Sequence, residues 1–297
     1  MKAEQLLERR KGIGGSDVAP ILGLSPWKTA HQVWEDKTGV VPPQEETPAM
    51  AYGKLIEPVL RQWYADSTGR KVLTPEHVLV HPKHDFVLGL LDGMTEDGRV
   101  IEIKTARSAR EWGEPGTDQI PVYYQMQVQQ YLMVTGFRVA DVVVSFAGSI
   151  PAIYEVPADQ ELQEMILEEE IEFWRKVQER IPPEPVSYQD MLSRFGRSSR
   201  AGAVIANEGA IQAVRDLKLL QSRMKVMESE EAALKALLMG TLKEDDILES
   251  PDGAILCTWK LAKAAQRFDA KALQADDPET YAKYLCNGQP SRRFLIK

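Results

Sequence analysis

The chain has 297 residues, 43% of them hydrophobic and 27% charged, which is enough apolar material for one large globular domain or two smaller ones. It has no run of about 18 apolar residues, which excludes a membrane-spanning helix. Its two cysteines exclude a disulfide framework, a four-thiolate zinc site and an iron–sulfur cluster within one chain.

The formal net charge of −8 is unevenly distributed along the chain. Residues 111–252 hold 13 basic and 25 acidic residues, a net of −12, whereas residues 253–297 hold 8 and 4, a net of +4. A polyanionic partner is therefore not excluded. The charged N-terminus lacks the apolar segment of a secretory signal, so we expect a reducing, cytoplasmic location.

The first 180 residues read as mixed α and β structure. Apolar spacing and glycine stops predict helices over residues 16–22, 29–37, about 55–68, 122–135 and 159–179. Short apolar runs predict strands over residues 78–80, 86–91, 100–105, 140–146 and 152–156. This order predicts an α/β (α+β) domain over residues 1–181, with a small mixed β-sheet flanked by helices.

A proline-rich stretch, residues 181–185, ends this pattern, and we expect a linker over residues 182–206. Residues 207–297 are expected to form a mainly helical arm with a basic tail. Within the arm, the spacing predicts a long helix or helical pair over Glu208–Leu242 with a packing face at Leu217, Leu220, Met224 and Met227. A further helix is predicted over residues 276–285 and a strand over residues 293–297.

The segment with the clearest chemical content surrounds a hairpin signal at Asp97-Gly98. Period-two alternation puts Glu102 and Lys104 on one face of the second strand, about 6.6 Å apart. If the loop has three residues, with Gly98 left-handed, Asp92 falls opposite Glu102, with Cβ atoms about 5 Å apart. A two-residue loop would put these two carboxylates on opposite faces.

Two carboxylates that close repel each other unless a cation lies between them. Oxygen ligands favour Mg²⁺ or Mn²⁺ over zinc, and the Ile103 carbonyl could supply a third oxygen. Lys104 could orient or deprotonate a water and offset charge on a phosphate. The alternative is an ordinary solvent-facing hairpin, on which Glu and Lys two residues apart are common.

Other residues of interest each have a structural alternative. Glu57 precedes Pro58 on a helix, where a kink could aim it at the hairpin, but it could also be a solvated acid. Gln127 and Tyr131 share a helix face, which is usually ordinary surface. Arg9 and Arg10 precede a glycine-rich turn and Ser16, a combination suited to a terminal phosphate, although Ser16 could simply cap a helix.

Together these pieces resemble the YqaJ-like viral recombinase family, relatives of phage lambda exonuclease in the PD-(D/E)xK nuclease superfamily. The resemblance covers about residues 4–180. The matching pieces are Gly12-Ile-Gly-Gly-Ser-Asp-Val-Ala-Pro-Ile-Leu-Gly-Leu-Ser-Pro-Trp27, Gly53-Lys-Leu-Ile-Glu-Pro58, Leu91-Asp-Gly93, Ile101-Glu-Ile-Lys-Thr105, Tyr124-Gln-Met-Gln-Val-Gln-Gln-Tyr131 and Glu172-Phe-Trp174.

The resemblance implies a PD-(D/E)xK nuclease core and a 5′→3′ exonuclease that acts on linear double-stranded DNA and leaves a 3′ single strand. It implies dependence on Mg²⁺, with Mn²⁺ as a substitute and two ions expected. It also implies a homo-oligomeric ring, first expected to be a trimer, a single-strand annealing protein as recombination partner, and phage or prophage origin in a bacterial host.

The family's functional residues transfer onto positions of this chain. Asp92, Glu102, the Ile103 carbonyl and Glu57 would hold the metal, and Lys104 would position the attacking water. Gln127 and Tyr131 would match the family's Gln-x-x-x-Tyr helix beside the hairpin. Arg9 with Ser16 would receive the 5′ phosphate, and Arg10 competes with Arg9 for that role.

Two alternatives stay open. The chain could be an endonuclease or repair nuclease of the same superfamily, or a catalytically inactive DNA-binding or scaffold protein. Residues from about 187 onward depart from shorter relatives. Their basic residues, which we expect to contact DNA, the annealing partner or a neighbouring subunit, are Lys260, Lys263, Arg267, Arg292 and Arg293.

Overall fold

The computed structural model describes residues 10–42, 45–147, 149–197, 202–286, 288 and 291–297. The chain forms two compact units, an N-terminal unit, Met1–Arg194, and a C-terminal unit, Phe195–Lys297. The expected domain limits at residues 181 and 207 stay predictions, whereas the backbone divides after Arg194.

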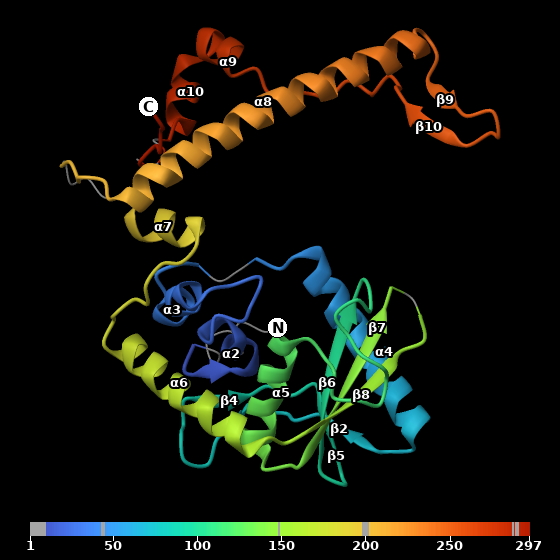
Figure 1. Cartoon of the computed structure of the whole chain (residues 1–297), viewed down its shortest axis with the longest axis vertical. Coiled ribbons are helices and arrows are strands. Elements are labelled where there is room, and N and C mark those ends of the chain that lie inside the picture. Colours follow the sequence, from blue (N-terminus) through green and yellow to red (C-terminus); the bar gives the residue numbers. More distant parts are fainter. Residues whose placement is uncertain (1–9, 43–44, 148, 198–201, 287, 289–290) are drawn as a thin grey trace. The chain divides into compact units, whose positions relative to one another are not determined.

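A five-stranded mixed sheet is the larger of the two sheets described in the N-terminal unit (Figure 1). In spatial order its strands are β2 (Val72–Leu73), β5 (Gly93–Thr95), β6 (Arg99–Ala106), β7 (Val139–Phe146) and β8 (Ala152–Pro157). β6 and β7 run parallel, and the other neighbours are antiparallel. The mixed sheet predicted from the sequence is confirmed.

A smaller sheet lies beside it and orders its strands as β1 (Ile13–Gly14), β4 (Val87–Gly89) and β3 (Leu79–Val80). β1 is parallel to β4, and β3 is antiparallel to it. The sequence did not indicate β1, because two residues are too few to show alternation. Through β1, the glycine-rich segment is bound into the fold.

The helices of the N-terminal unit begin and end within one residue of four of the predicted spans. They are α2 (Gly15–Ile21), α3 (Ala30–Thr38), α4 (Pro48–Thr68), α5 (Val122–Thr135) and α6 (Gln160–Gln178), followed by α7 (Tyr188–Phe195) at the junction of the units. Thr29, Thr47 and Asp159 cap α3, α4 and α6 with their side-chain oxygens. α4 continues through Pro58, so Glu57 lies in the interior of the helix and not at its start.

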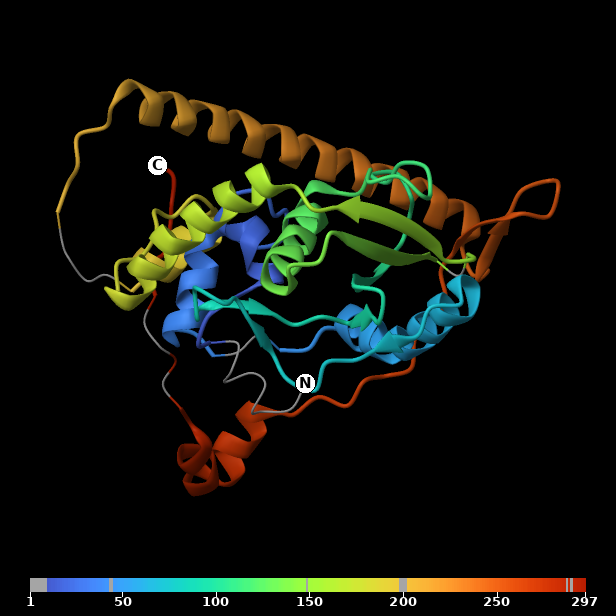
Figure 2. The same cartoon turned by 90° about the horizontal axis from the view of Figure 1, so that it is seen from below.

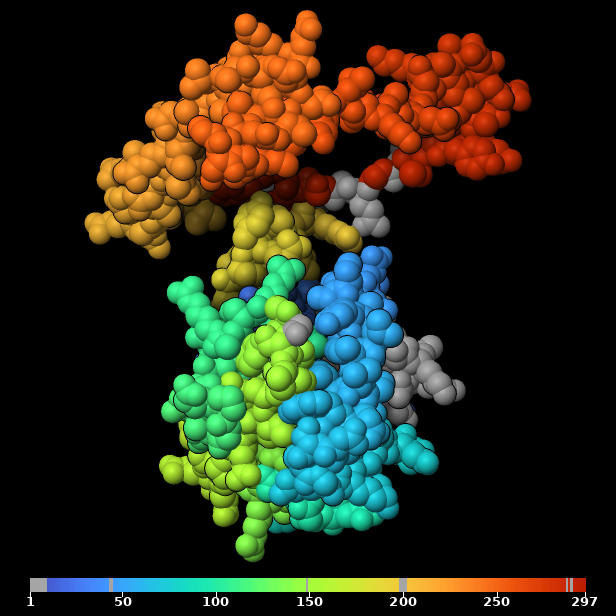
Figure 3. Space-filling view, turned by 90° about the vertical axis from the view of Figure 1, so that its right-hand side faces the viewer, coloured from blue at the N-terminus to red at the C-terminus, as the bar shows by residue number. Residues whose placement is uncertain are grey.

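Helices α4 and α5 cover opposite faces of the five-stranded sheet (Figure 2). Leu60 and Tyr64 of α4 pack on Ile101 and Ile103 of β6. On the other face, α5 packs on the side of β6 that carries Val100, and therefore Glu102 and Lys104 by strand alternation. Seen as a surface, α4 forms a blue ridge on this unit (Figure 3).

The segment 182–206, expected to be a linker, includes α7. Asp190 of α7 is buried, and its Oδ1 accepts a hydrogen bond from Thr29 Oγ1 at 3.0 Å. Its Oδ2 accepts hydrogen bonds from the amides of Val186 and Ser187, both at 3.1 Å. The bond to Thr29 fastens α7 to the start of α3, and the two amide bonds hold the chain that enters α7.

The C-terminal unit consists of α8 (Glu208–Leu242), a hairpin of β9 (Ile247–Glu249) and β10 (Ile255–Thr258), α9 (Ala270–Asp276) and α10 (Pro278–Tyr284). The helix predicted over residues 276–285 is α10, which begins two residues later and ends one residue earlier, and α9 was not predicted. The strand predicted over residues 293–297 does not form among the described residues. No described helix is both long and apolar enough to cross a membrane.

Candidate active site

The hairpin of β5 and β6 has the three-residue loop that places Asp92 opposite Glu102. Gly93 pairs with Ile101 and Met94 with Val100, and Gly98 is left-handed with φ of 83°. Continuing this register by one residue brings Asp92 to Glu102. Asp92 Oδ2 accepts a hydrogen bond from the amide of Ile103 at 2.8 Å, which holds the carboxylate against β6.

Helix α5 completes a polar cluster with β6. Glu102 and Lys104 form a buried ion pair through Oε1 and Nζ. Gln127 bridges the pair, because its Nε2 donates to Glu102 Oε1 at 2.7 Å and its Oε1 accepts from Lys104 Nζ at 3.1 Å. The same Nε2 donates to Tyr131 Oη at 3.0 Å. The structure thus brings together four residues that the sequence singled out on separate elements.

The position of α5 is fixed by two neighbouring features. The side-chain amide of Gln130 donates to the carbonyls of Ile13 and Leu88, each at 2.8 Å, and so ties α5 to β1 and β4. A Cβ added to Gly15 would lie 2.6 Å from Tyr131 Cε1, so only glycine allows this approach. The Gly-Gly-Ser segment is therefore packed against the Gln127–Tyr131 face of α5.

Glu57 reaches the site from α4 together with a residue that the sequence reasoning missed. Arg61, one helical turn after Glu57, forms an ion pair with it, and its Nε donates to the Asp92 carbonyl at 2.8 Å. The i, i+4 spacing of Glu57 and Arg61 was a usable signal for this pair. Arg61 thereby binds α4 to the start of the catalytic hairpin predicted from the sequence.

The three carboxylates make a strongly negative environment. Burial and the negative charge of Asp92 raise the pKa of Glu102 to about 8. Burial raises the pKa of Asp92, and burial followed by the Asp92 charge raises the pKa of Glu57. Burial opposes the charged form of Lys104, but Glu102 and Asp92 outweigh it and raise its pKa, so Lys104 stays an ammonium.

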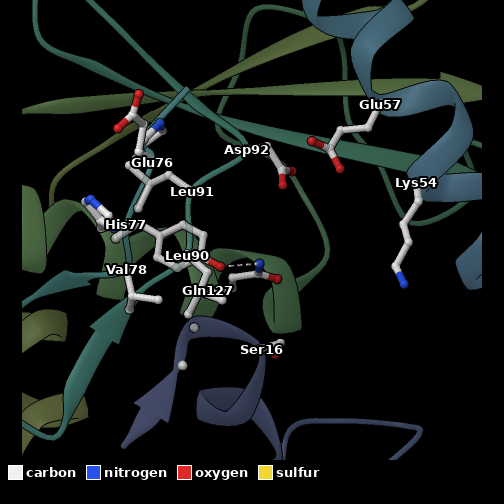
Figure 4. A pocket seen from close by; sticks show the side chains of 14 residues that line it. Ser16, Lys54, Glu57, Glu76, His77, Val78, Leu90, Leu91, Asp92 and Gln127 are labelled. Atoms are coloured by element: carbon white, nitrogen blue, oxygen red, sulfur yellow. Dashed lines mark hydrogen bonds between the residues drawn. The ribbon is translucent and has the colours of Figure 1, made fainter. Parts of the chain in front are cut away.

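A cavity of about 400 Å³ opens beside this cluster (Figure 4). The Glu57 and Asp92 carboxylates point toward each other across it, and Ser16 approaches from α2. Lys54, Gln127 and Tyr131 also line the cavity, which is large enough for a small polar group such as a nucleotide phosphate and sugar.

Of the two arginines expected to bind the phosphate, only Arg10 is among the described residues, and it does not line this cavity. Arg9 lies outside the described residues. Arg10 directs its guanidinium to the Val41 carbonyl at 3.3 Å and to Asp36 at 3.6 Å, so it faces α3 and the segment after it. Ser16 lines the cavity as expected.

An aromatic cluster borders Lys104 and was not recognised from the sequence. Lys104 Nζ lies 4.7 Å from the ring centroid of Tyr124. The Tyr123 ring packs 4.6 Å from that of Tyr124 and equally close to the ring of Trp27, which is 67% exposed. In the sequence, this cluster could have been expected from the adjacent Tyr123 and Tyr124, which lie one helical turn before Gln127.

The carboxylates of Glu57, Asp92 and Glu102 are the candidate ligands for a divalent cation. Among the described residues, no three His, Cys, Asp or Glu side chains are grouped as a metal site, because Glu102 faces Lys104 and Gln127 while Glu57 faces Arg61. Yet Glu102 Oε2 is buried without a hydrogen-bond partner in the described part of the chain, and the half-buried Asp92 lies opposite Glu102 on the hairpin. An orphaned carboxylate oxygen in an all-oxygen set fits Mg²⁺. The Ile103 side chain packs in the core and does not line the cavity.

Comparison with known proteins gives three findings. A family model described as the YqaJ-like viral recombinase domain matches residues 5–138. The uncharacterized protein YqaJ of Bacillus subtilis (strain 168) is 32% identical over 305 residues, which cover 99% of this chain and 93% of that protein. The alkaline exonuclease LHK-Exo from Laribacter hongkongensis has a similar fold, with a TM-score of 0.52 and 21% identity.

The structural match covers 61% of this chain and 94% of LHK-Exo. The structure of LHK-Exo in complex with dAMP matches almost equally, with a TM-score of 0.51 and 20% identity. The chain therefore shares its fold with an alkaline exonuclease.

Proposed function

The chain belongs to the YqaJ-like viral recombinase family, and on this premise we propose that it is a metal-dependent exonuclease. Its substrate would be linear double-stranded DNA, degraded from 5′ to 3′ to leave a 3′ single strand for annealing. The observation that carries the proposal is the hydrogen-bonded cluster of Asp92, Glu102, Lys104 and Gln127 beside the cavity.

Asp92, Glu102 and the Ile103 carbonyl would hold Mg²⁺, with Glu57 as the further acid, and Mn²⁺ would substitute. A second ion would also be held by these acids. When bound, the metal supplies a positive charge that polarises the phosphate and lowers the pKa of a water.

The side chains around the acids have separate tasks in this proposal. Lys104 keeps its proton, because the neighbouring carboxylates raise its pKa, and its ammonium orients the water and offsets charge on the phosphate. Gln127 holds Glu102 and Lys104 in their relative positions through its two hydrogen bonds. Asp92 is kept in place by the Ile103 amide.

For the 5′ phosphate we propose Ser16, which lines the cavity, with Arg9 as its partner. Arg10 is the weaker candidate, because its guanidinium is engaged by Val41 and Asp36. The expected ring assembly, annealing partner and location in the host cytoplasm belong to the same proposal.

A digestion assay tests it. Linear duplexes with 5′-phosphate or 5′-hydroxyl ends, labelled at one end, are incubated with Mg²⁺ and wild type, Lys104→Ala or Lys71→Ala. Lys71 pairs with Glu96 at the surface of the hairpin and serves as the control. We expect release of 5′ nucleotides, faster from phosphorylated ends, a loss of about 10²–10³-fold in Lys104→Ala and no loss in Lys71→Ala.

Circular duplex in the same assay distinguishes the alternatives. Cleavage of circles would favour an endonuclease. No Mg²⁺-dependent release by the wild type from any substrate would favour an inactive DNA-binding or scaffold protein.

A further inference from the structure

Helix α8 exposes a row of mainly apolar side chains. Successive positions of this row are three and then four residues apart, in alternation. These positions, which we name the α8 seam, are Ala210, Ala213, Leu217, Leu220, Met224, Met227, Glu231, Leu234, Leu238 and Thr241. Five of the larger side chains are 42–67% exposed: Leu220, Met224, Met227, Leu234 and Leu238.

The rest of the described C-terminal unit leaves this seam uncovered. Of the α8 residues, only Leu242 is buried, at the end of the helix. Exposed apolar side chains in a contiguous row are unfavourable in water and mark interaction surfaces. A strict alternation of four and three over more than four heptads is the pattern that two helices need to wind around each other.

We propose that α8 pairs in parallel and in register with α8 of a second copy of this chain, to form a two-stranded coiled coil. The first argument is charge. In a parallel pair, each residue directly before Ala210, Leu217, Met224, Glu231 or Leu238 faces the residue five positions later on the partner helix. Arg223 then meets Glu228 of the second copy, and Glu230 meets Lys235.

By the two-fold symmetry each of these attractive pairs occurs twice, and no like charges meet at the flanking positions. In an antiparallel pair in which every seam residue contacts a seam residue of the partner, Arg223 with Glu230 would be the one attractive charge pair at the flanking positions. The flanking charges therefore favour the parallel arrangement.

The second argument is size. A helix of 35 residues is about 52 Å long and about 10 Å wide, so two such helices meet over roughly 500 Å² on each partner. The total is close to the ~1,000 Å² that a specific interface requires.

Glu231 is the one charged residue in the seam. Its Oε1 lies 2.6 Å from Lys235 Nζ of the same helix. In a parallel pair Glu231 faces Glu231 of the second copy. This contact lowers the stability of the pair but fixes the register of the two helices, as single polar residues at core positions of coiled coils do.

Two adjacent leucines allow a matched test on the full chain. Leu219 and Leu220 are both 52% exposed, but only Leu220 lies in the seam. Analytical ultracentrifugation of wild type, Leu220→Glu and Leu219→Glu measures self-association, and circular dichroism verifies that both variants keep their helix content. We expect Leu220→Glu to weaken association at least about tenfold and Leu219→Glu to leave it unchanged.

Assembly through the N-terminal units would be common to both variants, so the difference between them isolates α8. A monomeric wild type, or equal association of the two variants, would overturn the proposal. Glu231→Leu, which removes the facing carboxylates, is expected to strengthen association, and an unchanged association would also contradict it.

Cysteine cross-linking tests the parallel arrangement. In a chain with Cys257→Ser and Cys286→Ser, we expect Leu234→Cys to form a disulfide between copies under mild oxidation, and Ser229→Cys, on the outer face, not to. An antiparallel pair would put residue 234 opposite residue 217, about 25 Å away from its counterpart. Failure of Leu234→Cys to cross-link would therefore overturn the parallel pairing.

Discussion

Glu102 is the residue around which the site is organised. One of its carboxylate oxygens is held by Lys104 and Gln127, while the other is buried without a partner among the described residues. A buried, unpaired carboxylate oxygen is costly unless a cation or proton reaches it. The elevated pKa of Glu102, about 8, and the proposed cation site therefore have the same physical cause.

Gly15 is the residue on which the approach of α2 to α5 depends. A Cβ at this position would meet the Tyr131 ring at 2.6 Å, whereas a Cβ at Gly14 would find ordinary contacts at 3.6 Å or more. We expect Gly15→Ala to lower the free energy of unfolding by about 1–3 kcal/mol and to displace Tyr131 from Gln127. Urea unfolding and the nuclease assay measure both effects.

Gly14→Ala is the matched control, since the two glycines are adjacent and both line the cavity. We expect Gly14→Ala to lower the free energy of unfolding clearly less than Gly15→Ala does. Equal stability of Gly15→Ala and wild type would show that α2 does not pack on α5 as described.

At the scale of the element, α6 carries a buried acid that has no role in the proposed chemistry. Both carboxylate oxygens of Glu170 are buried without hydrogen-bond partners among the described residues. Burial, followed by the negative charge of Asp17, raises the pKa of Glu170 well above its ordinary value. Asp17 itself pairs with Lys37 of α3 at 2.6 Å.

Because the pKa of Glu170 is higher in the folded than in the unfolded chain, the folded state favours its protonated form. The associated stability is complete below about pH 4.3 and is lost as the pH rises through the folded pKa. The glutamine of Glu170→Gln stays neutral at every pH. At pH 8 we expect the variant to have a higher Tm than wild type and a free energy of unfolding larger by about 1–3 kcal/mol. At pH 4 we expect both quantities to change little.

Thermal unfolding at the two pH values checks this expectation. Glu168→Gln, on the exposed face of the same helix, is the control and should be neutral at both. A Glu170→Gln variant that is no more stable at pH 8 than at pH 4, relative to wild type, would refute the assignment of a buried acid.

The elements differ in how well the sequence predicted them. Helices with clear stops, such as α5 before Gly136, and the hairpin loop that ends at Gly98 follow from local residue preferences and agree with the structure. β1 and α7 were not predicted, because their positions come from tertiary bonds, such as those of Gln130 and Asp190. Local pattern contains no signal for such partners.

The same distinction holds for the site. Asp92, Glu102 and Lys104 could be placed by counting along two strands, and the structure brings them together. The role of Gln127 came only from the family resemblance, and Arg61 was missed because an ion pair one helical turn long is common on helix surfaces. The Arg10 side chain faces α3, a direction that spacing alone does not determine.

At the scale of the whole molecule, the chain combines an acidic total charge with a proposed DNA substrate. Contacts to phosphates dominate such binding, so the affinity should not depend on sequence and should fall steeply with salt. With Lys104→Ala, which we expect to slow digestion strongly, we expect equal affinity for two unrelated duplexes and a loss of at least about tenfold between 50 and 200 mM salt.

Fluorescence anisotropy with end-labelled duplexes measures both quantities. Affinity that is insensitive to salt, or that differs strongly between the two sequences, would argue for base readout and against a nuclease that moves along any duplex.

The central claim is that Asp92 and Glu102 hold a divalent cation. Crystals of the wild type and of Glu102→Gln, grown with Mn²⁺, give the direct measurement through anomalous diffraction. We predict a peak at about 2.1 Å from oxygens of Asp92 and Glu102 in the wild type and its loss or strong weakening in Glu102→Gln. A wild-type crystal with saturating Mn²⁺ and no peak between these two carboxylates would contradict the account.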